Sequence, residues 1–220
     1  GVTAFPEKIP QLLDQLLLDY RVYNFGVGNY GLDQIVLRFQ ATHAAFRDAD
    51  IIIGVLTEDL GRCLLSVRQA LKPYFRIERG ELALRGVPIE EKPGEWLRRH
   101  PPRVPSYFLA FAGARLALGA PWKRFEEERL NARILEEALE EAREHDRPLL
   151  FVIFYAEGEL ASEGYRERFL KLHLARLDVP FVDTKQALLG RARRDGVGVS
   201  AFYRQGDGHL NAVGNRIVAE

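Results

Sequence analysis

Residues 50–56 read DIIIGVL, an almost wholly apolar run in a chain of 220 residues. A strand with apolar side chains on both sides is typical of a parallel sheet whose two faces are covered by helices. Residues 149–155, which read LLFVIFY, have the same character. The two runs therefore predict two buried strands in a parallel central sheet.

Shorter elements surround these two runs. Arg21–Phe25 and Val179–Val182 predict two short strands, and Tyr74–Ile89, which alternates apolar and polar residues around Arg79-Gly80, predicts a peripheral β-hairpin. Helical spacing of apolar residues predicts helices at Glu7–Leu18, Asp33–Phe46, Ser106–Leu118, Lys123–His145, Ser162–Leu177 and Leu210–Glu220. This order favours an α/β fold, a three-layer α/β/α sandwich with a mainly parallel sheet and ligand sites beyond the carboxyl ends of its strands.

Composition narrows the class of protein. A hydrophobic content of 47% in 220 residues is enough for one large core, so we expect a single domain over residues 1–220 with a hairpin insertion at 74–89. Thirty-one basic residues balance thirty-one acidic ones, which gives no overall field to attract nucleic acid or an anionic membrane. No run approaches the roughly 20 apolar residues of a membrane span. We expect a soluble protein, either cytoplasmic or exported.

A glycine-rich segment offers the first candidate site. Residues 26–31, GVGNYG, match the glycine pattern of dinucleotide-binding turns and come between an expected strand and an expected helix. Glu58 or Asp59, after the next strand, could hold a ribose hydroxyl in such a Rossmann unit. The alternative is a tight turn that uses the conformational freedom of glycine.

The second candidate site is the segment Asp207-Gly208-His209-Leu210-Asn211, which precedes an expected helix. Asp207 and His209 are two positions apart and cannot share a helix face, but in a turn the carboxylate can reach the imidazole and fix its tautomer. The pair then supplies a general base and the group that orients it. A solvated turn or a helix cap is the alternative.

With these motifs the chain resembles the SGNH or GDSL-like hydrolase superfamily over nearly its whole length. Residues 207–215, DGHLNAVGN, are similar to the family block that carries the catalytic Asp and His. Residues 21–34 resemble its oxyanion block, and residues 51–62 occupy the place of the block that holds an oxyanion Asn. Residues 1–18 resemble the stretch that directly follows the nucleophile. The resemblance implies a flavodoxin-like sandwich.

The resemblance also implies a role for individual residues. His209 would act as general base and then general acid, and Asp207 would orient its ring and stabilise its cation. Backbone N–H groups around Gly26, Gly28 and Asn29 would face the developing oxyanion. Asn29 stands where the family has glycine, and Asn tolerates the left-handed backbone conformation.

Two departures from the family pattern concern the chemistry directly. Glu58 and Asp59 stand near the position of the oxyanion Asn, where an ionised carboxylate repels the developing charge; Arg62 is a candidate for anchoring this loop or the substrate. The family's Gly-Asp-Ser nucleophile is expected before residue 1, and the nucleophile is unknown here. None of four serines has a comparable strand-to-turn context: Ser66, Ser106, Ser162 and Ser200.

These observations lead to a serine esterase, or the related acyltransferase, that removes or transfers a small acyl group such as acetyl on a carbohydrate, without a cofactor. The expected partner is a small-molecule or carbohydrate ester. One alternative is a non-catalytic SGNH-like protein that binds carbohydrate or serves assembly, and the other is a Rossmann-type nucleotide-binding protein.

The remaining polar candidates have simpler interpretations. Cys63 follows Arg62 beside an apolar pair and is expected to be a small buried hydrophobe, since a single cysteine provides no internal disulfide. Arg191, Arg193 and Arg194 are interpreted as a solvated loop. Trp96 and Trp122, next to helical segments, are interpreted as packing. Four histidines are expected at the surface without paired ligands at metal spacing, which leaves no metal site: His43, His100, His145 and His173.

Overall fold

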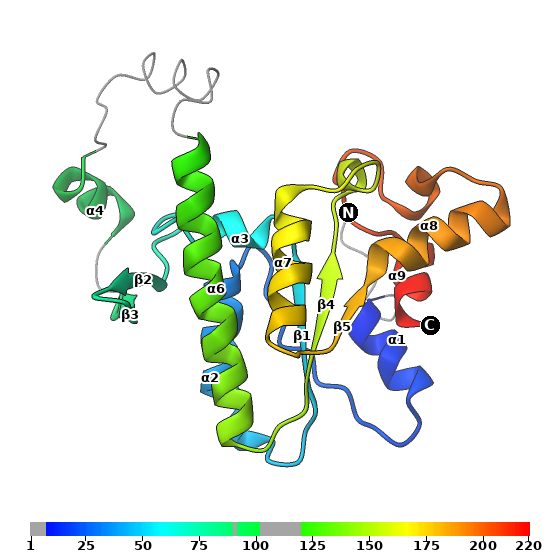
Figure 1. Cartoon of the computed structure of the whole chain (residues 1–220), viewed down its shortest axis with the longest axis horizontal. Coiled ribbons are helices and arrows are strands. Elements are labelled where there is room, and N and C mark those ends of the chain that lie inside the picture. The colour runs from blue at the N-terminus through cyan, green and yellow to red at the C-terminus, as the bar shows by residue number, and fades with distance from the viewer. Residues whose placement is uncertain (1–7, 90–91, 102–119) are drawn as a thin grey trace. The chain divides into compact units, whose positions relative to one another are not determined.

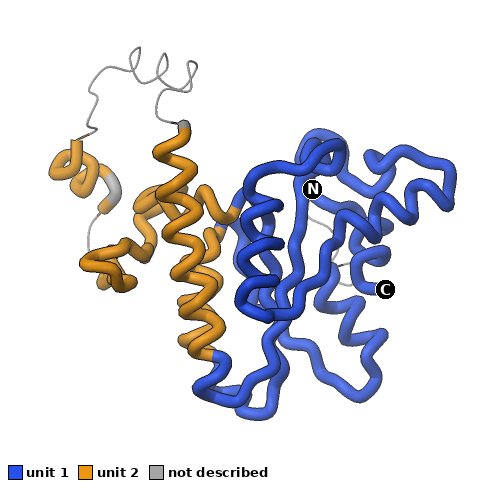
Figure 2. Tube along the Cα trace, viewed as in Figure 1, with its two compact units in different colours: residues 1–29, 43–58, 142–220 blue, residues 30–42, 59–141 orange. Residues whose placement is uncertain are grey.

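The computed structural model describes residues 8–89, 92–101 and 120–220 (Figure 1). The chain divides into two compact units, shown in Figure 2. Unit 1 comprises residues 1–29, 43–58 and 142–220, and unit 2 comprises residues 30–42 and 59–141. The single domain that the sequence indicates stays a prediction.

A three-stranded parallel sheet forms the centre of unit 1. The strands are β1 (Ile51–Leu56), β4 (Leu149–Phe154) and β5 (Phe181–Asp183), in the order β1-β4-β5. Ile51 pairs with Leu149, and all three strands run in the same direction (Figure 1). The two apolar runs and the later short strand are therefore confirmed. One detail is corrected: Ile52 is half exposed, so β1 is not covered on both faces.

Three helices of unit 1 agree with the apolar spacing, with shorter bounds: α1 (Ile9–Leu16), α7 (Tyr165–Arg176) and α9 (Ala212–Ala219). Unit 1 also contains α8 (Thr184–Asp195), which the spacing did not predict, and the short 3-10 helices η2 (His43–Ala45), η3 (Glu157–Glu159) and η4 (Val199–Phe202). Helix α9 packs against α1 and α8, and α8 also packs against β4. The helix expected at Ser106–Leu118 lies outside the described residues.

Helix α8 replaces the solvated loop that the sequence indicated. Its first turn is capped by the Asp183 side chain, which accepts from the backbone N–H of Lys185 at 3.1 Å, and its end by Gly196 with a φ of 65°. The interpretation of Arg191, Arg193 and Arg194 as a loop was therefore wrong.

The strand expected at Arg21–Phe25 is also wrong, because the segment has no ladder partner among the described residues. Its aromatic residues pack on a single ring instead. The rings of Tyr23 and Phe25 lie 4.8 Å and 5.4 Å from that of Phe46. Alternating aromatic residues thus reflect a local cluster here and not a position in the sheet.

Unit 2 contains α2 (Leu32–Thr42), α3 (Asp59–Arg62), β2 (Tyr74–Glu78), β3 (Glu81–Arg85), α4 (Pro93–Arg99) and most of α6 (Ala120–Glu144). The hairpin expected at 74–89 is confirmed, with Arg79 and Gly80 at φ values of 53° and 94°, as a two-residue turn requires. Buried Ile134, Leu135 and Ala138 line one side of α6. In the part of the chain that the structure describes, no helix has the length and apolarity needed to cross a bilayer.

Candidate functional site

Residues 203–210, named here the Asp207 turn, form a closed loop just before α9. Tyr203 and Leu210 make an antiparallel bridge, and the backbone N–H of Arg204 donates to the carbonyl of His209 at 2.8 Å. Gly206 and Gly208 have φ values of 79° and 69°, which only glycine adopts without strain. The glycines on either side of Asp207 therefore allow the chain to double back on itself.

The imidazole of His209 is fixed in one tautomer by this turn. Its Nδ1 lies 2.8 Å from the carbonyl oxygen of Asp207. A carbonyl oxygen can only accept a hydrogen bond, so Nδ1 carries a proton, and in the neutral ring Nε2 is the nitrogen with the lone pair. The side chain is 75% exposed. Nε2 is therefore the nitrogen that can take a proton from a group brought to the turn.

The Asp207 carboxylate acts mainly on the backbone. It accepts from the N–H of His209 at 2.8 Å, whereas its distance to Nδ1 is 3.5 Å. The same N–H donation lowers the pKa of Asp207, and the charges of His209 and Arg204 act in the same direction. The carboxylate is thus a fixed negative charge beside the ring, while the Asp207 carbonyl sets the tautomer that the sequence assigned to the carboxylate.

Tyr203 joins the Asp207 turn to the sheet. Its hydroxyl donates to the backbone carbonyl of Tyr155, directly after β4, at 3.1 Å. Burial raises the pKa of Tyr203 to about 12, and the carboxylates of Glu157 and Glu159 add to the shift. The turn is therefore held at the carboxyl end of β4, the edge where ligand sites of parallel sheets form.

The junction between the turn and α9 is equally constrained. Asn211 caps α9 by accepting from the N–H of Gly214 at 3.0 Å, and its amide donates to the carbonyl of Ala201 at 2.8 Å. A Cβ at Gly214 would lie 2.3 Å from the carbonyl oxygen of Phe202. The Asn and the Gly of the DGHLNAVGN segment thus fix the turn against the helix that follows it.

A polar network follows the ends of all three strands. The Thr57 hydroxyl, after β1, donates to the carboxylate of Glu159 at 2.6–2.7 Å. Lys185, after β5, is buried and donates to the carbonyls of Glu159 and Ser162 and to the carboxylate of Glu167 at 2.8–2.9 Å. We name Thr57, Glu159, Glu167 and Lys185 the strand-end network.

Sequence reasoning missed Tyr203 and the strand-end network. The available signal was position, because Glu159 and Lys185 closely follow two strands at the edge where parallel sheets bind ligands. Neither residue belongs to a recognisable motif, and their partners come from distant segments.

The backbone of the glycine-rich turn in unit 1, residues 26–29, determines which N–H groups could bind an oxyanion. Asn29 has a φ of 68°, as expected for an Asn in a glycine position, and nothing lies within 4 Å of a Cβ built at Gly28. The N–H of Gly26 already donates to the Asn24 side chain at 2.9 Å. Of the three residues assigned to the oxyanion site, Gly26 therefore has its N–H occupied.

The nucleotide-binding interpretation of residues 26–31 requires a strand directly before the glycines. The strand required before the glycines is missing among the described residues, as shown above. Within unit 2, Asp33 is buried in the first turn of α2, where it accepts from the N–H of Gln34 at 2.8 Å and pairs with Lys72. A carboxylate already fills the position where a pyrophosphate would meet the helix amides.

Glu58 and Asp59, the two acidic residues that follow β1, differ in their burial. Glu58 is exposed, whereas Asp59 is buried and forms a close ion pair with Arg62. Arg62 also donates to the carbonyl of Tyr30 at 3.2 Å. Arg62 therefore anchors a loop, one of the two roles expected for it, and it balances the charge of Asp59.

The remaining candidates are Cys63, the tryptophans and the histidines, and one pair of histidines differs from the sequence prediction. Cys63 is buried and burial raises its thiol pKa well above the usual value, which agrees with a packing role. Trp96 stacks on His100 at 4.3 Å, also as packing. His43 and His145, however, lie together with ring centroids 4.4 Å apart. The expectation that the histidines stand without partners at metal spacing was wrong for this pair.

No protein-family model, no curated protein and no solved structure matches this chain. A function for this chain is therefore inferred from the chemistry of the residues described above.

Proposed function

We propose that the protein is a serine esterase, or the related acyltransferase, of the SGNH type, with His209 as its general base. The proposal includes the flavodoxin-like three-layer sandwich, of which the parallel sheet β1-β4-β5 forms the centre. Its site lies at the carboxyl end of the sheet, around the Asp207 turn.

The observation that carries the proposal is the 2.8 Å contact between Nδ1 of His209 and the Asp207 carbonyl oxygen. Nδ1 donates to the Asp207 carbonyl, so Nε2 is the free base of a turn that Tyr203 holds at the end of β4. A histidine that serves only as a surface residue needs no fixed tautomer. A general base needs one, because its reactive nitrogen must be unprotonated before the substrate arrives.

The reaction proceeds in two balanced steps. A serine, placed by the family resemblance before residue 1, attacks the ester carbonyl while His209 Nε2 takes its hydroxyl proton, and the same nitrogen returns this proton to the departing alcohol. Water, or a sugar hydroxyl in the acyltransferase, then gives its proton to Nε2 and attacks the acyl-enzyme. Nε2 returns this proton to the departing serine oxygen, which releases the acid or the new ester and restores the serine. Asp207 stabilises the imidazolium that exists between these transfers.

The developing oxyanion is assigned to backbone donors near Gly28 and Asn29. Asn29 has a left-handed backbone with a φ of 68°, a conformation that also occurs in turns whose N–H groups bind anions. Arg62 offsets the charge of Asp59, and the exposed Glu58 side chain has room to turn to solvent. A neutral ester of a small acyl group, such as acetyl on a carbohydrate, suits a site that already contains several carboxylates.

The test is hydrolysis of p-nitrophenyl acetate by the full-length protein. His209→Ala is expected to lower kcat/KM by about 10²–10⁴-fold, the usual contribution of a general base. The matched control is His100→Ala, which removes a second exposed histidine and should leave the rate unchanged. Equal rates for the two variants would contradict the assignment of His209.

A non-catalytic carbohydrate-binding protein of the same fold is the alternative, and the strong exposure of the His209 ring is consistent with it. The two functions give different results in one comparison. An esterase releases p-nitrophenol in a His209-dependent manner, whereas a binding protein shows saturable association with an acetylated oligosaccharide and no turnover.

A further inference from the structure

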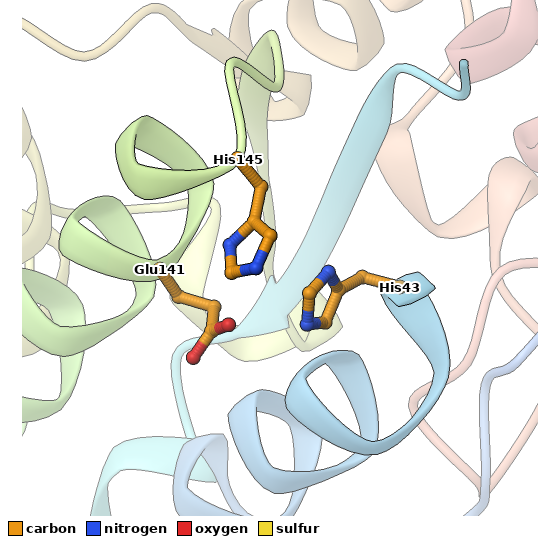
Figure 3. Close-up of side chains that lie close together, drawn as sticks. All are labelled: His43, Glu141 and His145. Carbon is orange, nitrogen blue, oxygen red and sulfur yellow. The ribbon is translucent and has the colours of Figure 1, made fainter. Parts of the chain in front are cut away.

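Three side chains with metal-binding atoms meet where two helices end (Figure 3). His43 follows the last residue of α2, Glu141 lies in the last turn of α6, and His145 follows the end of α6. One nitrogen of each imidazole and one carboxylate oxygen all lie within 4.8 Å of one another. Figure 3 shows the two rings and the carboxylate turned toward a common space.

The positions of the three residues follow from local structure. Glu141 lies in the last turn of α6 and His145 is the first residue after the helix, where its N–H still donates to the carbonyl of Ala142 at 3.3 Å. The spacing of four residues therefore places both side chains on the same side of the helix end. His43 and His145 are both in unit 1, with rings inclined by 67°. In unit 2, the Gln40 amide donates to Glu141 at 3.2 Å and to Glu137 at 3.0 Å. Gln40 therefore orients the carboxylate.

Two imidazoles and one carboxylate suit some metal ions better than others. Zn²⁺ binds nitrogen and carboxylate oxygen at about 2.0–2.1 Å and commonly uses two His and one Glu, with a fourth position open to water. Mg²⁺ and Ca²⁺ prefer sites made of oxygen alone, so two imidazoles disfavour them.

The arrangement requires only small movements to close on an ion. Ligands of a tetrahedral zinc ion lie about 3.4 Å apart, so a separation of 4.8 Å must shorten by about 1.4 Å. His43 is buried and fixes one ligand, whereas Glu141 is half-buried and His145 is exposed. The latter two can rotate toward the ion while His43 stays in place.

We propose that His43, Glu141 and His145 form a zinc-binding site, with Gln40 as the residue that positions the carboxylate. The site is separate from the chemistry assigned to His209 and does not depend on it. The affinity for zinc falls as the pH is lowered because protons compete for the ligands.

The test is calorimetric titration of zinc chloride into the full-length, tag-free protein after treatment with a chelator. We expect one zinc ion per chain. His43→Ala and His145→Ala should each weaken binding by more than 100-fold, and Gln40→Ala by about 10–100-fold, the usual effect of an outer partner. His100→Ala is the control and should bind zinc like the wild type.

The variant Glu141→Gln distinguishes the loss of a zinc ligand from misfolding, because it keeps the shape of the side chain and removes its charge. Zinc should raise the melting temperature of the wild type and of His100→Ala, but not that of Glu141→Gln, whose melting temperature without zinc should be unchanged. The proposal is overturned if the wild type binds no zinc, or if His43→Ala and His145→Ala bind it as tightly as His100→Ala does.

Discussion

Replacing Gly214 with alanine tests whether the Asp207 turn is fixed by its contact with α9. The added Cβ would lie 2.3 Å from the carbonyl oxygen of Phe202 and 2.9 Å from the Leu210 side chain. Ordinary van der Waals contact begins at 3.4 Å, so backbone must move by roughly 1 Å at the junction. Overpacking of this kind costs about 1–3 kcal/mol in the free energy of unfolding.

Thermal unfolding measures this effect, at about 2–4 °C per kcal/mol for a chain of this size. The matched control is Gly158→Ala, where nothing lies within 4 Å of the new Cβ and the expected change is within about 0.5 kcal/mol. Because a displacement of about 1 Å at a catalytic group can lower the rate by 10²-fold, ester hydrolysis should fall even where Gly214→Ala is folded. Equal stability of the two variants would refute the close contact.

Three further predictions concern the same region. Tyr203→Phe removes the hydroxyl that donates to Tyr155 and should lower the free energy of unfolding by about 0.5–1.5 kcal/mol in urea titrations; a neutral result contradicts the anchoring role. Lys185→Met leaves buried acceptors unpaired and should cost about 3–5 kcal/mol in the same titration, with a cost below 1 kcal/mol as the contrary result. The pKa of Asp207 is lowered by the His209 N–H, so the turn is stabilised above the ordinary carboxyl pKa and loses this contribution as the pH falls through the lowered value. The protection of the His209 amide, which is its exchange rate relative to the intrinsic rate at each pH, should therefore fall with acid in the wild type but not in Asp207→Asn.

The sequence predicted the elements whose signal is local. The apolar runs at 50–56 and 149–155 contain β1 and β4, because strands of a parallel sheet are rich in apolar side chains, although Ile52 of β1 is half exposed. The Arg79-Gly80 pair marked the hairpin, because both positions of its turn require positive φ.

Elements that depend on distant partners were not predicted. Arg21–Phe25 has the aromatic alternation of a strand, but its rings pack on Phe46 and no ladder forms. Helix α8 has a charged sequence that resembles a loop, and its caps, Asp183 and Gly196, were the signal that could have shown it.

The same difference between local signals and distant partners applies to the candidate site. Asp207 and His209 were predictable because both belong to one short turn, although the carbonyl that fixes the tautomer is a detail of backbone geometry. His43 and His145 are far apart in the sequence and meet only through the packing of the chain, so no spacing rule finds them.

In the proposed mechanism, Nε2 of His209 activates a serine for attack on an ester. The most direct measurement is covalent labelling of the full-length protein with a fluorophosphonate, which reacts with activated serines whatever the natural substrate is. We predict one labelled serine in the wild type and in His100→Ala, and no labelling in His209→Ala. Labelling that persists at the same rate in His209→Ala, or a wild-type protein that takes up no label, would contradict the account.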